Sequence, residues 1–142
     1  MNISIQITHW DSAKSMVMPI RHEIFIHEQK VPEELEWDEF DQDALHAIVK
    51  KDQQVIGTAR LIINNTIARI GRMAIQKEYR EQGIGQKLLS TLIQTAKEKG
   101  GQECILHAQT HAIAFYAKAD FEPHGPIFEE AGIPHVAMRL ML

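Results

Sequence analysis

The chain has 142 residues, 44% of them hydrophobic and 24% charged, and its formal net charge at pH 7 is −4. This apolar content is enough for one well-packed core, so we expect residues 1–142 to form a single globular domain. The acidic balance argues against nucleic-acid binding. No stretch approaches the roughly 18 apolar residues that a membrane helix needs. Neither nucleic acid nor a membrane is therefore an expected partner.

The N-terminal sequence and the cysteine content favour a cytoplasmic protein. Residues 1–4 contain no basic region leading into an apolar segment, so we expect no export signal. Cys104 is the only cysteine, which excludes a disulfide within the chain and fits a reducing compartment. We predict a cytoplasmic location and small-molecule partners.

The first elements are predicted to be a strand and a helix. Apolar and polar residues alternate over residues 3–7, the period of a half-buried strand, and Asp11 or Ser12 is suited to cap a following helix. Apolar residues at spacings of three and four predict a helix over residues 13–24. Pro19 lacks an N–H, so we expect it to kink or restart that helix.

The middle of the chain is typical of an antiparallel meander. Residues 45–50 and 54–63 are apolar strands around a turn, and residues 64–65 make a tight turn into a third strand that ends near Ile75. The apolar phase of this third strand slips at Gly71, which predicts a β-bulge there.

The remaining pattern predicts a mixed α/β order. An apolar stripe over residues 88–96 predicts a helix that stops at the glycine pair 100–101. Residues 104–106 then indicate a buried strand, residues 112–119 a short helix, and residues 136–142 a closing strand.

Residues 80–85, between the meander and the long helix, have the composition of a phosphate-binding turn. Two glycines allow backbone N–H groups to point outward, and the helix adds the positive end of its dipole. A dinucleotide-binding turn would carry a third glycine where Leu88 stands, and a nucleoside-triphosphate loop would end in Gly-Lys-Ser/Thr, whereas Gln86 follows Gly85. NAD and ATP are thus disfavoured, while a glycine turn that only caps a helix is the structural alternative.

Two motifs, in order along the chain, resemble those of the GNAT N-acetyltransferases. The strand IGRMAI (residues 70–75) and the segment YREQGIGQKLL (residues 79–89) resemble the acyl-CoA-binding motif of that family, Gln/Arg-x-x-Gly-x-Gly/Ala. AFYAKADF (residues 114–121) resembles its second motif, except that Asp120 replaces the usual glycine. The resemblance covers nearly the whole chain. It implies an α/β (α+β) GNAT fold, with a mixed, mostly antiparallel sheet of about six to seven strands and about four helices.

Three further segments carry a narrower likeness. They are FIHEQKVP (residues 25–32), HAQ (residues 107–109) and EAGIPH (residues 130–135). These segments resemble the small bacterial GNAT branch that includes the ElaA- and YjcF-type proteins, whose substrates are poorly defined. Relatives are often dimers, which by analogy makes a homodimer an expectation.

The resemblance implies acetyl-CoA as the acyl donor and a set of contacts for it. The backbone of the third meander strand would bind the pantetheine arm, and N–H groups of the glycine turn would hold the pyrophosphate beside the Arg80 side chain. Gln109 would contact the cofactor or order the helix that follows it. The implied cofactor-binding residues are Met73, Ala74, Ile75, Arg80, Glu81, Gln82, Gly83, Ile84, Gly85, Gln86, Gln109 and Phe115.

Tyr116, the tyrosine of the second motif, is the predicted proton donor. Transfer from a thioester to an amine needs a proton for the departing thiolate, and a phenol of pKa near 10 has comparable basicity. A backbone N–H near Met73 or Ala74 would stabilise the oxyanion. Five side chains are able to accept the proton of the ammonium group, and no spacing rule separates them: Glu28, His46, His107, Glu130 and His135. Of these, we take Glu28 and His135 as the catalytic candidates.

Residues 33–43 carry seven acidic residues and no basic one, interleaved with Leu35, Trp37 and Phe40. One interpretation is a solvated loop anchored by those three apolar side chains. The other is an acidic cover that attracts a cationic amine beside the acceptor channel, with Trp37 and Asp38 facing the substrate.

The leading hypothesis is an N-acetyltransferase that moves an acetyl group directly from the CoA thioester to a primary amine of a small molecule or peptide. The alternative is a non-catalytic acyl-CoA sensor on the same fold. Direct transfer needs no acyl-enzyme, so we expect Cys104 to be a buried apolar residue. The eight histidines form no His-Glu-x-x-His motif, and no metal is expected.

Overall fold

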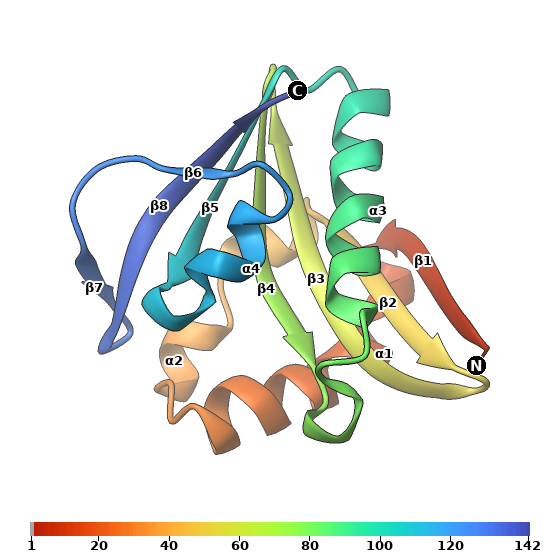
Figure 1. The fold of residues 1–142 in the computed structure, drawn as a ribbon. Helices are drawn as coiled ribbons and strands as arrows, with labels where there is room; N and C mark the ends of the chain where they lie inside the picture. The colour runs from red at the N-terminus through yellow and green to blue at the C-terminus, as the bar shows by residue number, and fades with distance from the viewer. Residues whose placement is uncertain (1) are drawn as a thin grey trace.

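The computed structural model describes residues 2–142, and in this part of the chain eight strands form one sheet (Figure 1). Their order is β1-β2-β3-β4-β5-β8-β6, with β7 paired to β8, and all pairings are antiparallel except that of β4 with β5. The strands are β1 (Ile3–His9), β2 (Leu45–Lys51), β3 (Gln54–Asn64), β4 (Ile67–Ile75), β5 (Glu103–Gln109), β6 (Glu122–Pro123), β7 (Phe128–Glu130) and β8 (Ile133–Met141).

Helices flank the sheet on both faces, with α1 and α2 on one side and α3 and α4 on the other (Figure 1). The predicted α/β class with a mixed, mostly antiparallel sheet is confirmed, and the strand number rises to eight because the short β6 and β7 also pair with β8. The helical segments are α1 (Trp10–Arg21), the π-helix η1 (His22–Glu28), α2 (Glu33–Glu36), α3 (Ile84–Glu98), α4 (Ile113–Ala117), and the 3₁₀ segments η2 (Glu39–Gln42), η3 (Lys77–Tyr79) and η4 (Thr110–Ala112).

The first helix differs from its prediction at both ends. It begins at Trp10, and the cap position is His9 in an extended conformation with no side-chain cap bond, so the predicted Asp11 or Ser12 cap is wrong. The chain passes directly from β1 into the helix because the Trp10 side chain is buried there. Pro19 lies inside α1, and the helix continues past it to Arg21 before its hydrogen bonding widens into the π-helix η1.

The predicted bulge in β4 is confirmed, one residue beyond Gly71. Thr58 of β3 pairs with Ala74, whereas Arg60 pairs with Gly71, so two residues of β4 lie opposite one residue of β3. Arg72 is one of these two, and its φ of +50° is in the left-handed region. The bulge turns the end of β4 and directs the Arg72 side chain towards the segment that contains α2 and η2.

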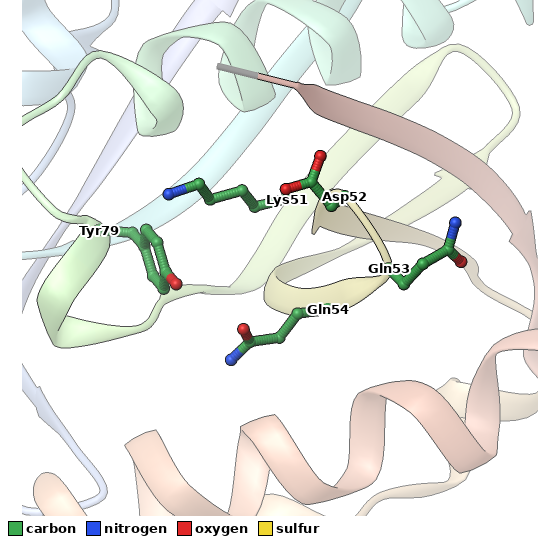
Figure 2. Close-up of a pocket in the computed structure, with 5 residues that line it drawn as sticks. All are labelled: Lys51, Asp52, Gln53, Gln54 and Tyr79. Carbon is green, nitrogen blue, oxygen red and sulfur yellow. The ribbon is translucent and has the colours of Figure 1, made fainter.

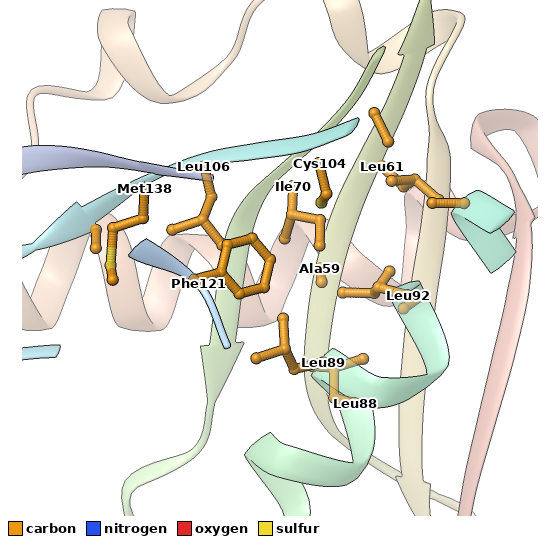
Figure 3. Packing of buried hydrophobic residues seen from close by; sticks show 14 of the residues in the cluster. Ala59, Leu61, Ile70, Leu88, Leu89, Leu92, Cys104, Leu106, Phe121 and Met138 are labelled. Atoms are coloured by element: carbon orange, nitrogen blue, oxygen red, sulfur yellow. The ribbon is translucent and has the colours of Figure 1, made fainter. Parts of the chain in front are cut away.

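The main core lies between α3 and the sheet. The predicted apolar stripe of α3 is buried against strand residues such as Ala59, Ile70 and Leu106 (Figure 3). The helix ends as predicted at Gly100, which has a φ of +88°, and the N–H of Gly101 donates to the Ala96 carbonyl at 2.8 Å. The buried stripe residues of α3 are Ile84, Leu88, Leu89, Leu92 and Ala96.

Cys104 and Asp120 show how the core treats two residues singled out in the sequence. Cys104 is fully buried against this core, as expected, and burial raises the pKa of its thiol to about 12. Asp120 has a φ of +71°, so it adopts the left-handed conformation available to the glycine that it replaces. The turn before the buried Phe121 is thus kept without a glycine.

The parallel pair β4 and β5 separates along its length. The two strands are paired only from Ile67 with Glu103 to Ile70 with Leu106. Beyond Ile70, β4 continues to Ile75 and still pairs with β3, but its edge towards β5 has no partner strand. β5 stays paired with β8. The separation leaves a gap in the sheet between the carboxyl ends of β4 and β5 (Figure 1).

Candidate active site

The loop between β4 and α3 presents a cradle of backbone donors. Glu81 and Gly83 have φ values of +63° and +83°, and Gly83 is the N-cap of the 15-residue helix α3 with no side-chain cap bond. The N–H groups of the first helical turn are therefore free of side-chain acceptors in the described chain. Together with the helix dipole they form a site suited to an anion.

Arg80 and Glu28, predicted for different roles, form an ion pair. The Arg80 guanidinium donates to both Glu28 carboxylate oxygens at 2.8 and 3.0 Å, and its Nε donates to the Ile75 carbonyl at 2.8 Å. The pair fastens the end of β4 to the end of η1. The Arg80 hydrogen bond and positive charge also lower the pKa of the Glu28 carboxyl.

Gly85 allows the first turn of α3 to pack closely against Phe115 of α4. A Cβ at this position would lie 3.1 Å from Cζ of Phe115, whereas a Cβ at Gly83 would meet nothing within 4 Å. The Gln86 Nε2 also donates to the Phe115 carbonyl at 3.1 Å. Phe115 therefore packs against the first turn of α3. This contact joins the two sequence motifs, residues 79–89 and 114–121.

Tyr116 points from α4 into the gap beside β4. Its hydroxyl lies 3.8 Å from Sδ of Met73, and its ring packs edge-on against Phe115 and Phe121 with centroids 5.0 and 6.2 Å apart. Burial raises the pKa of Tyr116 to about 12. The phenol is thus held protonated at neutral pH, with a thioether as its weak acceptor.

A cavity of about 730 Å³ opens on the face of the sheet opposite α3, and Tyr116 and Met73 form part of its wall. Its other walls come from the end of η1, the segment from α2 to η2, strands β3, β4 and β5, and the turn between β7 and β8. Gln109, Asp38 and His135 line this cavity, while Glu28 and His46 lie outside its lining. The structure therefore brings the predicted acid to one space with four other predicted site residues, Asp38, Met73, Gln109 and His135, and with the base candidates His107 and Glu130.

Gln109 connects two elements at the mouth of the gap. Its Nε2 donates to Oε1 of Gln29 at 2.9 Å, and its Oε1 lies 2.8 Å from Nε2 of His111. Because a carbonyl oxygen only accepts, His111 Nε2 is the donor in this contact. Gln109 thus joins the end of β5 to the residue that follows η1.

Three base candidates that sequence spacing did not separate form one cluster. Nδ1 of His107 lies 2.9 Å from Oε1 of Glu130, and Nε2 of His135 lies 3.8 Å from Oε2 of the same carboxylate. His135 is 7% exposed, and its Nδ1 donates to the Ile133 carbonyl at 2.7 Å, which leaves Nε2 as the accepting atom of the neutral ring. Phe128, which no sequence signal indicated, packs edge-on against His107 at 5.0 Å.

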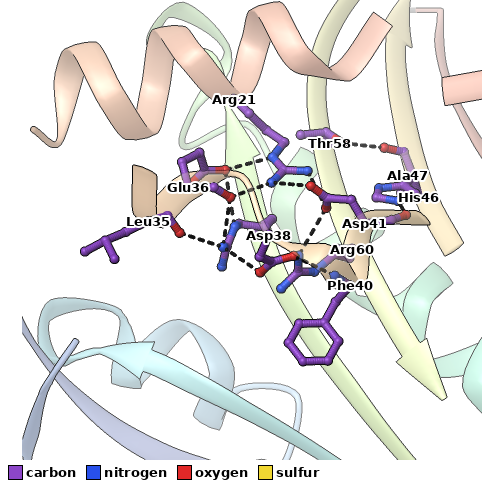
Figure 4. Close-up of polar contacts among 11 residues, drawn as sticks. Arg21, Leu35, Glu36, Asp38, Phe40, Asp41, His46, Ala47, Thr58 and Arg60 are labelled. Carbon is purple, nitrogen blue, oxygen red and sulfur yellow. Dashed lines mark hydrogen bonds and ion pairs between the residues drawn. The ribbon is translucent and has the colours of Figure 1, made fainter. Parts of the chain in front are cut away.

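An ion-pair network that the sequence did not reveal borders the cavity, and Figure 4 shows its contacts. Arg21 of α1 donates to Glu36 at 2.8 Å and to Asp41 at 2.8 and 3.3 Å, and these three residues are each 1% to 3% exposed. The Arg21 guanidinium also lies over the Trp37 ring, 5.0 Å from its centroid. Trp37 therefore contacts this buried charge.

Asp38 joins the network from the cavity side. Arg60 of β3 donates to Asp38 at 2.7 Å and to Asp41 at 3.1 Å, and Arg72 donates to Asp38 at 3.1 Å and to the Glu36 carbonyl at 3.0 Å. Asp38 also accepts from the Phe40 N–H at 3.1 Å. Its carboxylate is therefore saturated by cations of the protein.

The network corrects the expected anchoring of residues 33–43. Leu35 and Phe40, expected as anchors, are each 53% exposed, whereas Glu36 and Asp41 are buried. The segment is held by ion pairs, because the arginines compensate the cost of burying the acids. Burial raises the pKa of the Glu36 carboxyl. Burial also opposes ionisation of Asp41, but hydrogen bonds and charges of the arginines outweigh it and lower that pKa.

A second hollow, of about 490 Å³, lies beside the turn between β2 and β3 (Figure 2). Lys51 and Tyr79 face each other across it, with the ammonium 5.3 Å from the ring centroid. Three polar residues of the turn complete its lining: Asp52, Gln53 and Gln54. The hollow adjoins the cradle, since Tyr79 directly precedes Arg80, but it gathers no acid–base pair suited to acyl transfer.

Residues 2–142 contain neither a metal centre nor a membrane-spanning helix. No group of three or more His, Cys, Asp or Glu side chains in that range is arranged to hold a metal ion. No helix in that range is long and apolar enough to cross a membrane.

The fold is that of an acyltransferase. A family model described as "Acetyltransferase (GNAT) domain" matches residues 11–142. Because this match spans most of the sequence, the chain belongs to the GNAT acetyltransferase family.

Sequence relatives confirm the ElaA/YjcF-like branch indicated by the shorter segments. YyaT of Bacillus subtilis (strain 168), described as an uncharacterized protein, is 39% identical over 141 residues, which cover 97% of this chain and 94% of YyaT. YjcF of the same organism, described as an uncharacterized N-acetyltransferase, is 32% identical over 120 residues, with coverage of 84% and 86%.

Solved structures share the whole fold. The crystal structure of Escherichia coli ElaA superposes with a TM-score of 0.88 at 26% identity, covering 97% of this chain and 99% of ElaA. A GNAT family acetyltransferase from Elizabethkingia anophelis, solved with acetyl-CoA bound, has a TM-score of 0.76 at 20% identity and 99% coverage of both chains. The fold is thus shared with a protein that holds an acyl-CoA.

Proposed function

We propose that this acyltransferase is an acetyl-CoA-dependent N-acetyltransferase that moves an acetyl group directly to a primary amine of a small molecule or peptide. The observation that carries the proposal is the position of Tyr116. Its partly buried, protonated hydroxyl lies 3.8 Å from Met73 Sδ, at the gap between β4 and β5, and Tyr116 lines the cavity. A proton donor at this junction suits a reaction in which a thiolate leaves.

The described residues fit an acyl-CoA on both sides of that junction. The cradle formed by residues 80–86 offers backbone N–H groups to a diphosphate. The edge of β4 at Met73, Ala74 and Ile75 is unpaired towards β5, so its N–H and C=O groups are able to bind the pantetheine amides as an added strand does. The acetyl-CoA found in the Elizabethkingia anophelis structure, on the same fold, supports this choice of donor.

The proposed reaction balances with groups of this chain. The amine nitrogen attacks the thioester carbonyl, a backbone N–H near Met73 or Ala74 stabilises the resulting oxyanion, and the carbon–sulfur bond then breaks. Tyr116 donates its proton to the departing thiolate and regains one from solvent. The nitrogen loses its extra proton to a base, which leaves the amide and free CoA.

We assign the role of base to His135 rather than to Glu28. His135 lines the cavity, the Nε2 of its ring is the accepting atom, and Glu130 at 3.8 Å would stabilise the imidazolium that forms. Glu28 lies outside that wall, and its pairing with Arg80 lowers its pKa, which weakens it as a base.

A CoA-release assay over a panel of primary amines tests the proposal. We expect release of free CoA with at least one amine, and thermal stabilisation by acetyl-CoA and CoA but not by NAD or ATP. Stabilisation by NAD or ATP alone would overturn the donor assignment. Binding of acetyl-CoA without release for every amine would favour the sensor alternative.

A further inference from the structure

Arg69 is an exposed residue of the cavity lining, and its two neighbours across the sheet are apolar. It belongs to β4, where it pairs in register with Ile62 of β3 on one side and Ile105 of β5 on the other, and all three residues line the cavity. The next residue in this row across the sheet is Arg139 of β8, opposite Ile105, which lies outside the cavity and pairs with Glu103 at 3.3 Å.

Arg69 has no counter-ion from the protein in the described part of the chain, where it is exposed to solvent. Within residues 2–142, Arg69 forms neither an ion pair nor a side-chain hydrogen bond, whereas the two other arginines of the cavity wall, Arg60 and Arg72, are bound by carboxylates. The acids of the segment from α2 to η2 already form ion pairs with other arginines, so none of them is available to Arg69. The matched set is Arg21, Arg60 and Arg72 with Glu36, Asp38 and Asp41.

Apart from Arg69, the arginines of the cavity wall are Arg60 and Arg72, and carboxylates neutralise both. His107 follows Ile105 by two residues on the same face of β5, roughly 7 Å along the strand, and it holds the Glu130 carboxylate at 2.9 Å. The cavity therefore has a cationic pole at Arg69 and an acidic pole at Glu130. The proposed proton donor, Tyr116, contacts Met73, which lies further along β4 than Arg69.

We infer that the amine acceptor also carries an anionic group, a carboxylate or a phosphate, which Arg69 binds. An unpaired guanidinium above the apolar side chains of Ile62 and Ile105 favours such a group, because its fork of N–H donors matches two anionic oxygens. Arg69 precedes Met73 by four residues, about 13 Å along the strand, and the reach of the long arginine side chain shortens the separation between the anion and the amine. This inference rests on the proposed function and narrows its acceptor class.

Matched acceptors test the inference. The probes are 5-aminopentanoate and 6-aminohexanoate, each compared with its terminal carboxamide, and an aminoalkyl phosphate of similar length. For the wild type we expect kcat/KM to be about tenfold or more higher for the anionic member of a pair, mainly through KM, as a charged hydrogen bond would give. Arg69→Gln should abolish this preference, and Arg69→Lys should restore part of it.

Arg139→Gln is the matched control, since Arg139 lies in the same row but outside the cavity. It should leave the preference unchanged. Equal kcat/KM for acid and amide in the wild type, or a preference that survives in Arg69→Gln, would overturn the inference.

Calorimetric titration with the same probes gives a readout that does not depend on turnover. Tighter binding of the acid than of the amide, lost in Arg69→Gln, supports the inference even if no amine is acetylated, and in that event the proposed reaction would be rejected instead. Equal affinities for acid and amide would reject the role of Arg69.

Discussion

In the proposed reaction, the donor side and the acceptor side of the site are formed by different kinds of groups. The donor side consists of backbone: the free N–H groups at the start of α3 and the unpaired edge of β4. The acceptor side consists of side chains that come from several separate elements and are fixed by ion pairs such as those of Arg21. Backbone donors serve any protein with that local conformation, whereas a side-chain wall is specific to one sequence.

The difference implies that the two sides fail in different ways. The donor side depends on φ angles and close packing, as at Gly83 and Gly85, and should tolerate most side-chain changes. The acceptor side depends on long-range charges, so loss of one partner leaves another buried and unpaired. Four substitutions separate these behaviours, from the largest expected effect to the smallest.

Arg21→Met should destabilise the protein most, by about 3 to 5 kcal/mol, because it leaves Glu36 and Asp41 buried without their main partner. Urea unfolding measures the change. Arg139→Met, which breaks an exposed pair with Glu103, is the control and should cost about 0 to 1 kcal/mol. The affinity of the folded variant for acetyl-CoA should match the wild type, and a parallel loss of that affinity would contradict the separation of the two sides.

Tyr116→Phe should lower kcat about 100-fold or more, since it removes the proton donor while keeping the ring that packs on Phe115 and Phe121. Binding of acetyl-CoA, followed by calorimetry, should stay within about twofold. Tyr79→Phe is the control, with unchanged kcat. An unaltered kcat in Tyr116→Phe would remove the acid from the proposed mechanism.

The pH profile follows from the same residue. Burial raises the pKa of Tyr116 to about 12, so its acid form persists as pH rises, and kcat/KM should not fall through loss of this proton up to about pH 10, where an ordinary tyrosine is half ionised.

Gly83→Ala should reduce affinity for acetyl-CoA about tenfold, because a side chain strains the φ of +83° by about 1 to 2 kcal/mol and turns the cradle donors away. Gly125→Ala has the same kind of strain, with a φ of +98° and no neighbour within 4 Å, but lies away from the cradle. It should lose similar stability with unchanged affinity. Equal affinity losses in the two variants would show that strain alone, and not the cradle, sets the effect.

Glu28→Gln should have the smallest effect. The pair with Arg80 is more than one-third exposed on both sides, so its loss should cost well under about 1 kcal/mol. The lowered pKa of Glu28 means that this small contribution is present above the ordinary carboxyl pKa and disappears as pH falls through the folded value, a dependence that the variant should lack. If this variant instead lost turnover to the extent expected of Tyr116→Phe, the role of base would return to Glu28.

The sequence predicted the features that are encoded within a few neighbouring residues. The apolar stripe of α3, the β4 bulge and the glycine cradle each follow from periodicity or from a short motif. Arg21 was hidden because it sits among apolar residues at helical spacing, and its partners Glu36 and Asp41 are 15 and 20 residues away. Only the folded chain supplies such contacts.

The base candidates show the same limit. The residue types of His107, Glu130 and His135 were sufficient to nominate them, but their common cluster depends on the pairing of β5, β7 and β8. The expected cap at Asp11 or Ser12 failed for a related reason, since the helix begins two or three residues earlier, at the buried Trp10. A local capping preference is overridden where burial of a large side chain contributes more to the free energy of folding.

Because Cys104 is buried, the native protein should react only slowly with thiol reagents. The sequence holds one thiol, and it lies at zero exposure under α3 with its pKa raised to about 12, so almost none of it is the reactive thiolate at neutral pH. A chromogenic disulfide added to the native protein should therefore record the CoA released by turnover with little background. For the same reason, a single cysteine introduced near the cavity could be labelled with a spectroscopic probe without first replacing Cys104.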